Sequence, residues 1–100
     1  MARNVQNFID GKLADAADGR RVDLIDPSTG GVFGSAPVSG PADVDAAYRA
    51  AAGAFESWRD TTPSERQRAL LKFADAMEAR GEEIIGAECE NTGKPSELTR

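Results

Sequence analysis

The hydrophobic pattern of this chain changes once, at Ser39-Gly40-Pro41, and this change constrains the fold more than any other feature. Upstream of it, short apolar runs are separated by turn-forming residues, which is typical of strands and hairpins. Downstream of it, apolar residues recur at helical spacing. We therefore predict a strand-and-hairpin segment over residues 1–40 and a helical segment over residues 41–100.

Short strands are expected in the first segment because apolar and β-branched residues lie there between turn signals. Asp10-Gly11 is a strong hairpin signal, since the tight turn between two strands needs positive φ at both central residues. Asp18-Gly19 and residues 26–30 are further turns. The expected strands are Val5–Ile9, Lys12–Ala14, Arg21–Ile25 and Val32–Ala36.

Three helices are expected in the second segment. The first starts at Pro41, which suits the first helical position. The second starts at a capping box, in which Thr62 caps a backbone N–H and Glu65 reaches back to the cap. Gly81 stops or kinks that helix, and Gly93 ends the third in the left-handed conformation. The apolar stripes of the first two helices consist of Val44, Ala47, Tyr48, Ala51, Ala52, Phe55 and Trp58, and of Ala69, Leu70, Phe73, Ala74 and Met77.

The residues available for a core are few and small. Of the 40% of residues that are hydrophobic, 17 are alanine and one is cysteine. Leu, Ile, Val and Phe together make up 18% of the chain, at the edge of what compact folding requires. Either the helices pack closely through alanines, or they lean on a partner that is absent. We favour the second, and expect the isolated chain to be oligomeric or partly molten.

Charge and composition exclude several classes of function. The net charge is −5 and the basic residues are scattered among acidic ones, which argues against a nucleic-acid partner. No apolar run approaches membrane-spanning length, so no membrane partner is expected. The N-terminus lacks the apolar stretch of a secretory signal, and one cysteine makes no internal disulfide. These features point to the cytoplasm.

The Gly-Lys pair near the C-terminus does not form a phosphate-binding loop. Six residues separate Gly86 from Gly93, Pro95 follows Lys94, and the stretch leaves a helix instead of entering one. Cys89 has no histidine to activate it and lies between two glutamates, so we interpret it as a packing residue.

The remaining candidate sites also fail. The acidic turn around Gly19 lacks the calcium-loop ligands, because alanines and an isoleucine occupy the required positions. Gly30, Gly31 and Gly34 do not match a dinucleotide fingerprint. Adjacent glutamates on a helix do not converge on one point. From these residues alone we predict no catalytic constellation.

The order of short motifs along the chain is more specific than any single motif. The motifs are Asn7-Phe8-Ile9-Asp10-Gly11-Lys12, Ala16-Ala17-Asp18-Gly19-Arg20, Asp26-Pro27-Ser28-Thr29-Gly30, Ala42-Asp43-Val44-Asp45-Ala46-Ala47, Phe55-Glu56-Ser57-Trp58, Thr62-Pro63-Ser64-Glu65-Arg66 and Glu90-Asn91-Thr92-Gly93-Lys94-Pro95. Over nearly the whole chain, this set resembles the N-terminal segment of the NAD(P)-dependent aldehyde dehydrogenase superfamily. The last motif and Leu98-Thr99-Arg100 most resemble the γ-aminobutyraldehyde (4-aminobutanal) dehydrogenases, near the betaine-aldehyde branch.

The resemblance implies a longer α/β parent with a Rossmann-like cofactor domain, a catalytic domain and an oligomerisation hairpin. Residues 41–100 would pack on the cofactor domain, and the parent would be a homodimer or homotetramer. Its activity would oxidise an aldehyde, such as the ω-aminoaldehyde 4-aminobutanal, to the carboxylic acid with NAD(P)+. The chemistry is thiolate attack, hydride transfer to nicotinamide and thioester hydrolysis. The residues that perform it lie downstream of residue 100 in such proteins. No catalytic or cofactor-binding residue is therefore expected here, and the 100 residues alone would be inactive.

One feature of the family would reach into this segment. Many members hold a structural monovalent cation, and the matching ligands here are the backbone carbonyls of Leu24 and Ile25 and the side chain of Asn91. Asn91 stands where an aspartate is usual, so the site would lack one charge and bind more weakly. The alternative is that Asn91 caps the C-terminus of its helix.

A second function remains open, namely that of a complete small α+β module that binds partners through its helical face and has no catalytic activity. The length of the chain favours this alternative, whereas the order of the motifs favours the enzyme. A reading frame that continues past Arg100 would discriminate between them.

Overall fold

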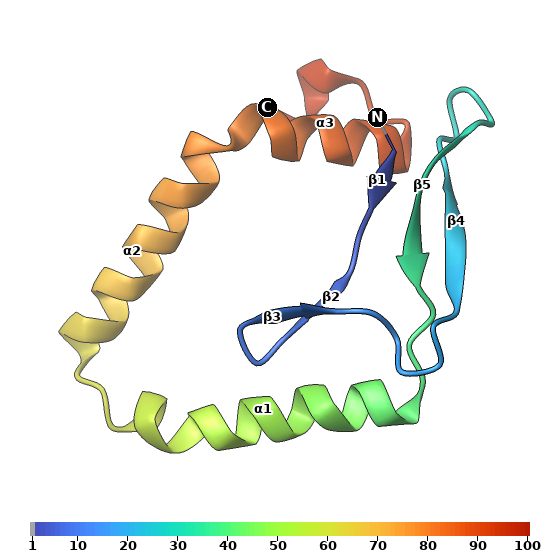
Figure 1. Cartoon of the computed structure of the whole chain (residues 1–100). Coiled ribbons are helices and arrows are strands. Elements are labelled where there is room, and N and C mark those ends of the chain that lie inside the picture. The colour runs from blue at the N-terminus through green and yellow to red at the C-terminus, as the bar shows by residue number, and fades with distance from the viewer. Residues whose placement is uncertain (1) are drawn as a thin grey trace. The chain divides into compact units, whose positions relative to one another are not determined.

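The computed structural model describes residues 2–100, which form five strands, three α-helices and one short 3₁₀ helix (Figure 1). They divide into two compact units, one with residues up to Ile25 and Gly31–Arg59, the other with Asp26–Gly30 and Asp60–Arg100. Strands precede helices, as predicted. Within residues 2–100, no helix combines the length and hydrophobicity needed to span a membrane.

The first unit contains a three-stranded sheet in the order β1-β5-β4. Strand β4 (Arg21–Ile25) runs antiparallel to β5 (Val32–Pro37), and the short β1 (Arg3–Asn4) runs parallel to β5. The predicted bounds of β4 are confirmed and β5 is one residue longer than predicted. Strand β1 was not expected, because two polar residues carry no alternating pattern.

A separate two-stranded hairpin joins β2 (Asn7–Ile9) to β3 (Lys12–Ala14). Its turn residues Asp10 and Gly11 have φ of 54° and 75°, which confirms the predicted turn. The expected strand Val5–Ile9 was too long. The N–H of Val5 instead donates to Ser35 O at 3.0 Å and continues the pairing of β1 with β5, so the chain leaves one sheet before it enters the hairpin.

Helix α1 (Pro41–Arg59) starts at the predicted proline. Asp43 in its first turn ties the helix to the preceding chain, since its carboxylate accepts hydrogen bonds from the backbone N–H groups of Ala17 and Gly40, each at 2.9 Å. This acceptor role is favourable at a helix N-terminus, where the dipole attracts negative charge. The hairpin strand β2 contacts α1.

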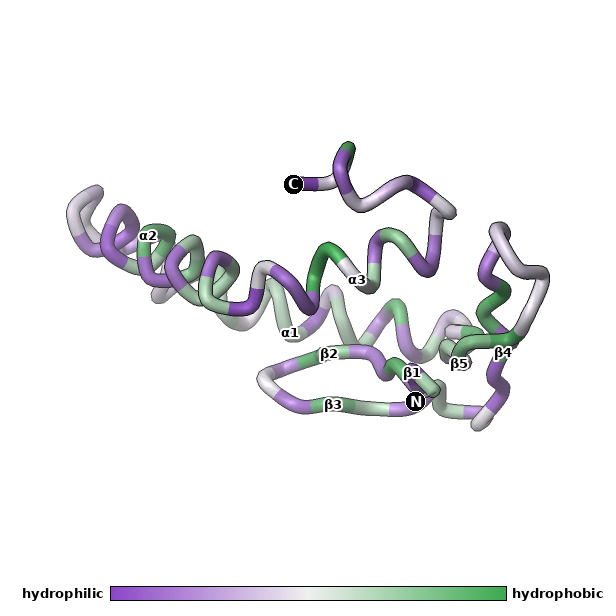
Figure 2. The backbone as a smooth tube through the Cα atoms, turned by 90° about the horizontal axis from the view of Figure 1, so that it is seen from above, coloured by the Kyte–Doolittle hydropathy of each residue, from purple (hydrophilic) through white to green (hydrophobic). Residues whose placement is uncertain are grey.

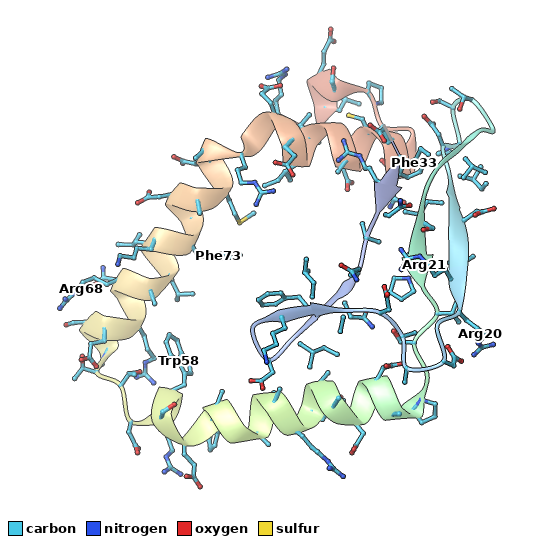
Figure 3. All side chains as sticks on the ribbon, in the orientation of Figure 1. Arg20, Arg21, Phe33, Trp58, Arg68 and Phe73 are labelled. Atoms are coloured by element: carbon cyan, nitrogen blue, oxygen red, sulfur yellow. The ribbon has the colours of Figure 1, made fainter. Side chains whose placement is uncertain are left out.

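Arg21, at the start of β4, joins three parts of the first unit (Figure 3). Its guanidinium donates to the carbonyls of Val5 at 2.6 Å and Ser35 at 3.0 Å, to the Ser35 hydroxyl at 2.9 Å and to Asp15 at 3.0 Å. Its side chain is 29% exposed, against 66% for Arg20, which forms an ion pair with Asp18. A planar fork of five donors suits Arg21 to this bridging position.

In the second unit, α2 (Pro63–Ala79) and α3 (Gly81–Thr92) are consecutive, and Arg80 ends one and begins the other. The capping box is confirmed, because Glu65 N–H donates to Thr62 Oγ1 at 3.2 Å and Thr62 N–H donates to Glu65 Oε2 at 2.8 Å. The 3₁₀ helix Ser96–Leu98 was not predicted. Arg100 pairs with Glu82 at 2.6 Å, so the C-terminal residues lie beside α3.

The core is as thin as the composition predicts. Among the described residues, Ala16 is the only buried hydrophobic residue, and no residue of the three α-helices is buried. Hydrophobic and hydrophilic residues are interspersed along the helices (Figure 2). The helices therefore form where the amphipathic pattern predicts them, but their apolar side chains remain largely exposed.

Candidate functional site

The turn Asp26–Gly30 is held by its first residue. The Asp26 carboxylate accepts hydrogen bonds from the Ser28 hydroxyl at 2.5 Å and from the Ser28 N–H at 2.8 Å, and its carbonyl accepts from Gly30 N–H at 2.8 Å. The Ser28 hydroxyl, followed by the Ser28 N–H, lowers the pKa of Asp26 because both donors favour the charged carboxylate. Gly30 completes the turn with a φ of 74°.

This turn packs against the end of α3, within the second unit. A Cβ placed at Gly93 would lie 3.1 Å from Pro27 Cγ, and Gly93 itself has a φ of 71°. The left-handed backbone favours glycine here, and an added Cβ would also force Pro27 to move by a few tenths of an ångström. Gly93 is the predicted C-terminal residue of the helix, and its N–H donates to Cys89 O at 2.9 Å.

The predicted cation ligands are divided between the two units, with Leu24 and Ile25 in the first and Asn91 in the second. The ladder between β4 and β5 is irregular between Leu24 and Ile25. Such an irregularity leaves a residue outside regular pairing, which suits backbone carbonyls that serve as ligands. No observation within either unit tests the full ligand set, and the cation site stays a prediction.

Asn91 lies inside the last turn of α3, and the residues after it cap the C-terminus of the helix. The Thr92 hydroxyl donates to Glu88 O at 2.8 Å and accepts from Lys94 N–H at 3.2 Å, while Gly93 provides the left-handed residue. Capping therefore falls to Thr92 and to Gly93, which was predicted as the left-handed C-terminal residue. The alternative, with Asn91 as the capping residue, placed the cap too early in the chain.

Cys89 is half-buried, and its Sγ lies 3.8 Å from Thr99 Oγ1. The chain contains no histidine that could serve as a base for this thiol. This geometry agrees with the prediction that Cys89 packs against its neighbours. The Gly-Lys pair likewise follows α3, and the element after it is a 3₁₀ helix of three residues, Ser96–Leu98, instead of the long helix that follows a phosphate-binding loop.

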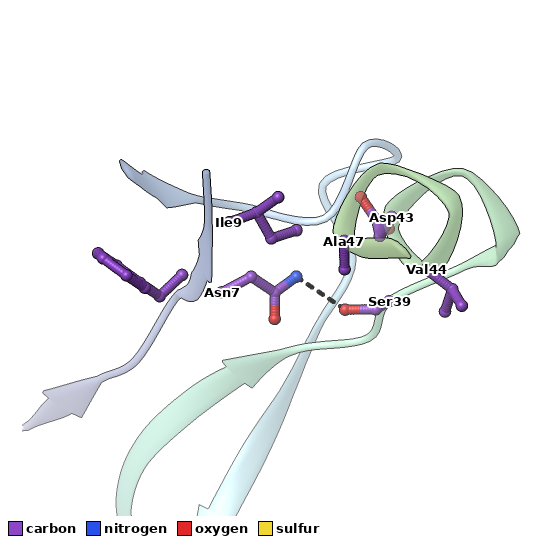
Figure 4. A pocket seen from close by; sticks show the side chains of 7 residues that line it. Asn7, Ile9, Ser39, Asp43, Val44 and Ala47 are labelled. Atoms are coloured by element: carbon purple, nitrogen blue, oxygen red, sulfur yellow. Dashed lines mark hydrogen bonds between the residues drawn. The ribbon is translucent and has the colours of Figure 1, made fainter. Parts of the chain in front are cut away.

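The first unit has a shallow groove of about 230 Å³ between β2 and α1 (Figure 4). Asn7 Nδ2 donates to Ser39 Oγ at 2.8 Å across it, and both oxygens of Asp43 already accept backbone hydrogen bonds. The remaining lining is apolar and comes from Phe8, Ile9, Val44 and Ala47. Asn7 and Ser39 thus pair with each other, and the Asp43 carboxylate is occupied by backbone donors, so these polar groups do not converge on a ligand.

The contacts of Arg21, Asp26 and Asp43 described above hold elements of the fold in place. Within residues 2–100 there is no cluster of three or more His, Cys, Asp or Glu side chains that could hold a metal ion. Sequence reasoning missed Arg21 and Asp43 as anchoring residues. The available signals were an arginine that opens a strand and an aspartate in the first turn of a helix.

Comparison with known proteins places this arrangement in one family. The model of the aldehyde dehydrogenase family matches residues 14–100. The 2-aminomuconic semialdehyde dehydrogenase of Homo sapiens is 42% identical over 96% of this chain and 19% of its own length. The 2-hydroxymuconic semialdehyde dehydrogenase of Pseudomonas sp. (strain CF600) is 37% identical over 96% of this chain and 20% of its own length.

Solved structures agree with the sequence relatives. The NAD-dependent aldehyde dehydrogenase of Sinorhizobium meliloti superposes with a TM-score of 0.94 and 35% identity over 99% of this chain and 20% of that protein. The chain thus spans about one fifth of the length of the relatives it matches. Because the family model covers most of the chain and the fold agrees, the chain belongs to the aldehyde dehydrogenase family.

Proposed function

We propose that this chain is the N-terminal part of a longer enzyme that oxidises an aldehyde to the carboxylic acid with NAD(P)+. The ordered match of residues 14–100 to the family model is the observation that carries this proposal. In this view the described residues supply scaffold, and the nucleophile, the general base and the cofactor site belong to the rest of the polypeptide. The absence of histidine and the packed position of Cys89 support that division.

The substrate is proposed to be a semialdehyde, a molecule with an aldehyde at one end and a carboxylate at the other. The two sequence relatives described above are named for aminomuconic and hydroxymuconic semialdehydes, and their similarity supports this class. The resemblance to γ-aminobutyraldehyde dehydrogenases favours instead an ω-aminoaldehyde, whose far end carries an ammonium group. The two proposals differ in the charge that the substrate pocket must accept.

Steady-state kinetics on the polypeptide that continues past Arg100 test both levels of the proposal. NADH or NADPH formation at 340 nm is measured with a semialdehyde, with 4-aminobutanal and with an uncharged aldehyde of similar length. A higher kcat/KM for the semialdehyde supports the first class, and a higher value for 4-aminobutanal supports the second. If no aldehyde leads to reduction of NAD+ or NADP+, the proposed enzymatic function is refuted. Residues 1–100 alone should show no activity.

The proposal extends to a homodimeric or homotetrameric enzyme in the cytoplasm. The single cysteine of these residues supports a reducing compartment, since it makes no disulfide within them. The competing function is a stand-alone interaction module, which the exposed apolar helix faces favour. A native gene that ends at codon 100 and yields a well-folded monomer would support the module instead.

A further inference from the structure

The chain contains two Asp-Gly steps, Asp10-Gly11 and Asp18-Gly19, and both lie in exposed turns. In such a step the backbone nitrogen of the glycine can attack the aspartate side chain, because glycine has no Cβ to hinder the approach. The two glycines are closely matched, with φ of 75° and 74°, and a Cβ added at either would meet no atom within 4 Å. A difference in reactivity between the two steps must therefore come from the contacts around them.

The step Asp18-Gly19 is held by hydrogen bonds on both of its reacting groups. The Gly19 N–H donates to Ala16 O at 2.9 Å. The Asp18 carboxylate accepts from the Arg20 N–H at 3.0 Å and from Arg20 Nε at 2.8 Å. The Arg20 N–H, followed by the Arg20 side chain, lowers the pKa of Asp18, which keeps the group as a carboxylate, a poorer electrophile than the neutral acid.

The step Asp10-Gly11 has no such protection. Within residues 2–100, the Gly11 N–H donates no hydrogen bond and the Asp10 carboxylate accepts none. Asp10 has a φ of 54° and is the one non-glycine residue with positive φ among those described, a conformation that few such residues adopt. Its hairpin (Figure 1) has three residues in each strand, and so small a two-stranded hairpin opens readily. An open groove of about 370 Å³ along α1 leaves the turn room to rearrange.

We propose that Asp10 is a site of spontaneous isomerisation to isoaspartate, and that hydrogen bonds protect Asp18 from the same reaction. The Gly11 nitrogen forms a bond to Asp10 Cγ, and one carboxyl oxygen leaves as water with the amide hydrogen and the carboxyl proton. Water then opens the succinimide ring at the α-carbonyl, which leaves the main chain running through Cβ and Cγ. Water is released in the first step and consumed in the second, so the mass is unchanged and no other reactant is needed.

The product would change the hairpin. The additional main-chain carbon falls in the two-residue turn that closes the pair Ile9↔Lys12, so the two strands would lose their register. This reaction is independent of aldehyde oxidation by the same polypeptide.

Incubation of the full-length polypeptide at neutral pH and physiological temperature, followed by digestion with trypsin, tests the proposal. The two steps fall in separate tryptic peptides, residues 4–12 and 13–20. Isoaspartate peptides are separated by liquid chromatography at unchanged mass, and the modified residue is located by electron-transfer fragmentation. We expect isoaspartate to accumulate at Asp10 roughly tenfold faster than at Asp18, since at least two hydrogen bonds around Asp18-Gly19 must open before the attack.

Two controls assign this difference to the fold. In urea, where the hydrogen bonds are lost, the two sites of the same chain should isomerise at similar rates. Arg20→Ala removes one of the protecting bonds and should raise the rate at Asp18 about fivefold, with the rate at Asp10 unchanged.

Four results would overturn the proposal. They are equal rates at the two sites in the native protein, no isoaspartate at Asp10 in the native protein although the chain in urea forms it, a difference between the sites that persists in urea, and an unchanged rate at Asp18 in Arg20→Ala.

Discussion

Gly34 lies directly against the backbone of β1, so Gly34→Ala is a sharp test of how the sheet is built. A Cβ at this position would lie 1.9 Å from Arg3 O and 2.7 Å from Arg3 C. Ordinary contact begins at 3.4 Å, so the new methyl group would need about 1.5 Å of movement (3.4 − 1.9) from backbone atoms. A flexible side chain could swing aside, but a carbonyl in a paired strand can move only with its strand.

We therefore expect Gly34→Ala to displace β1 from β5. The displacement would break the hydrogen bond from Val5 N–H to Ser35 O and at least one more bond of the pair Arg3↔Gly34 and Asn4↔Ser35. At about 1 kcal/mol net for each bond, the local cost is about 2 kcal/mol. This corresponds to a roughly 30-fold increase in the opening equilibrium of the strand.

Amide hydrogen exchange of Val5, followed by NMR, measures that equilibrium. The matched control is Gly40→Ala, because a Cβ at Gly40 meets no atom within 4 Å and neither glycine has positive φ. The Val5 amide should exchange about 30 times faster in Gly34→Ala and at nearly the original rate in Gly40→Ala. Equal exchange rates in the two variants would show that β1 does not lie against Gly34.

Three further substitutions test other contacts. Arg21→Lys keeps the charge but loses the guanidinium fork that reaches Val5 O, Ser35 and Asp15, so the free energy of unfolding in urea should fall by about 1–2 kcal/mol. The control Arg20→Lys should change this free energy by less than about 0.5 kcal/mol. Equal effects of the two substitutions would contradict the bridging role of Arg21. Thr62→Ala removes the acceptor for Glu65 N–H and should destabilise the start of α2 by about 1 kcal/mol. The Glu65 amide should then exchange its hydrogen faster, and an unchanged exchange rate would argue against the capping box. The Ser28 hydroxyl and N–H lower the pKa of Asp26 below the ordinary value of an aspartate, so the stabilisation of its turn is present above that ordinary value and is lost as pH falls through the lowered pKa. The NMR shift of the Ser28 amide should follow this titration, and a Ser28 shift that does not change across it would refute the assignment.

Local signals in the sequence were sufficient for the helices and most turns. The capping box at Thr62 and the left-handed Gly93 depend on residues close together in the chain, so their geometry follows from residue type and spacing. The hairpin at Asp10-Gly11 was predictable for the same reason.

Contacts between distant residues were not predictable from such signals. Strand β1 exists because Arg3 and Asn4 pair with Gly34 and Ser35, about thirty positions away, and neither residue has a strong strand preference. The bridging role of Arg21 requires Val5, Asp15 and Ser35 to converge, which only the folded chain brings about. The cation ligands Leu24, Ile25 and Asn91 came from family resemblance alone and stay a prediction.

The second unit is assembled from two stretches of chain, because the turn Asp26–Gly30 belongs to it although the strands on either side of that turn do not. A protease cut in the connection after Arg59 would therefore leave Pro27 still seated against Gly93, on a different peptide. The two products would behave as complementing fragments, and their separation would require the release of a five-residue loop as well as a single cleavage.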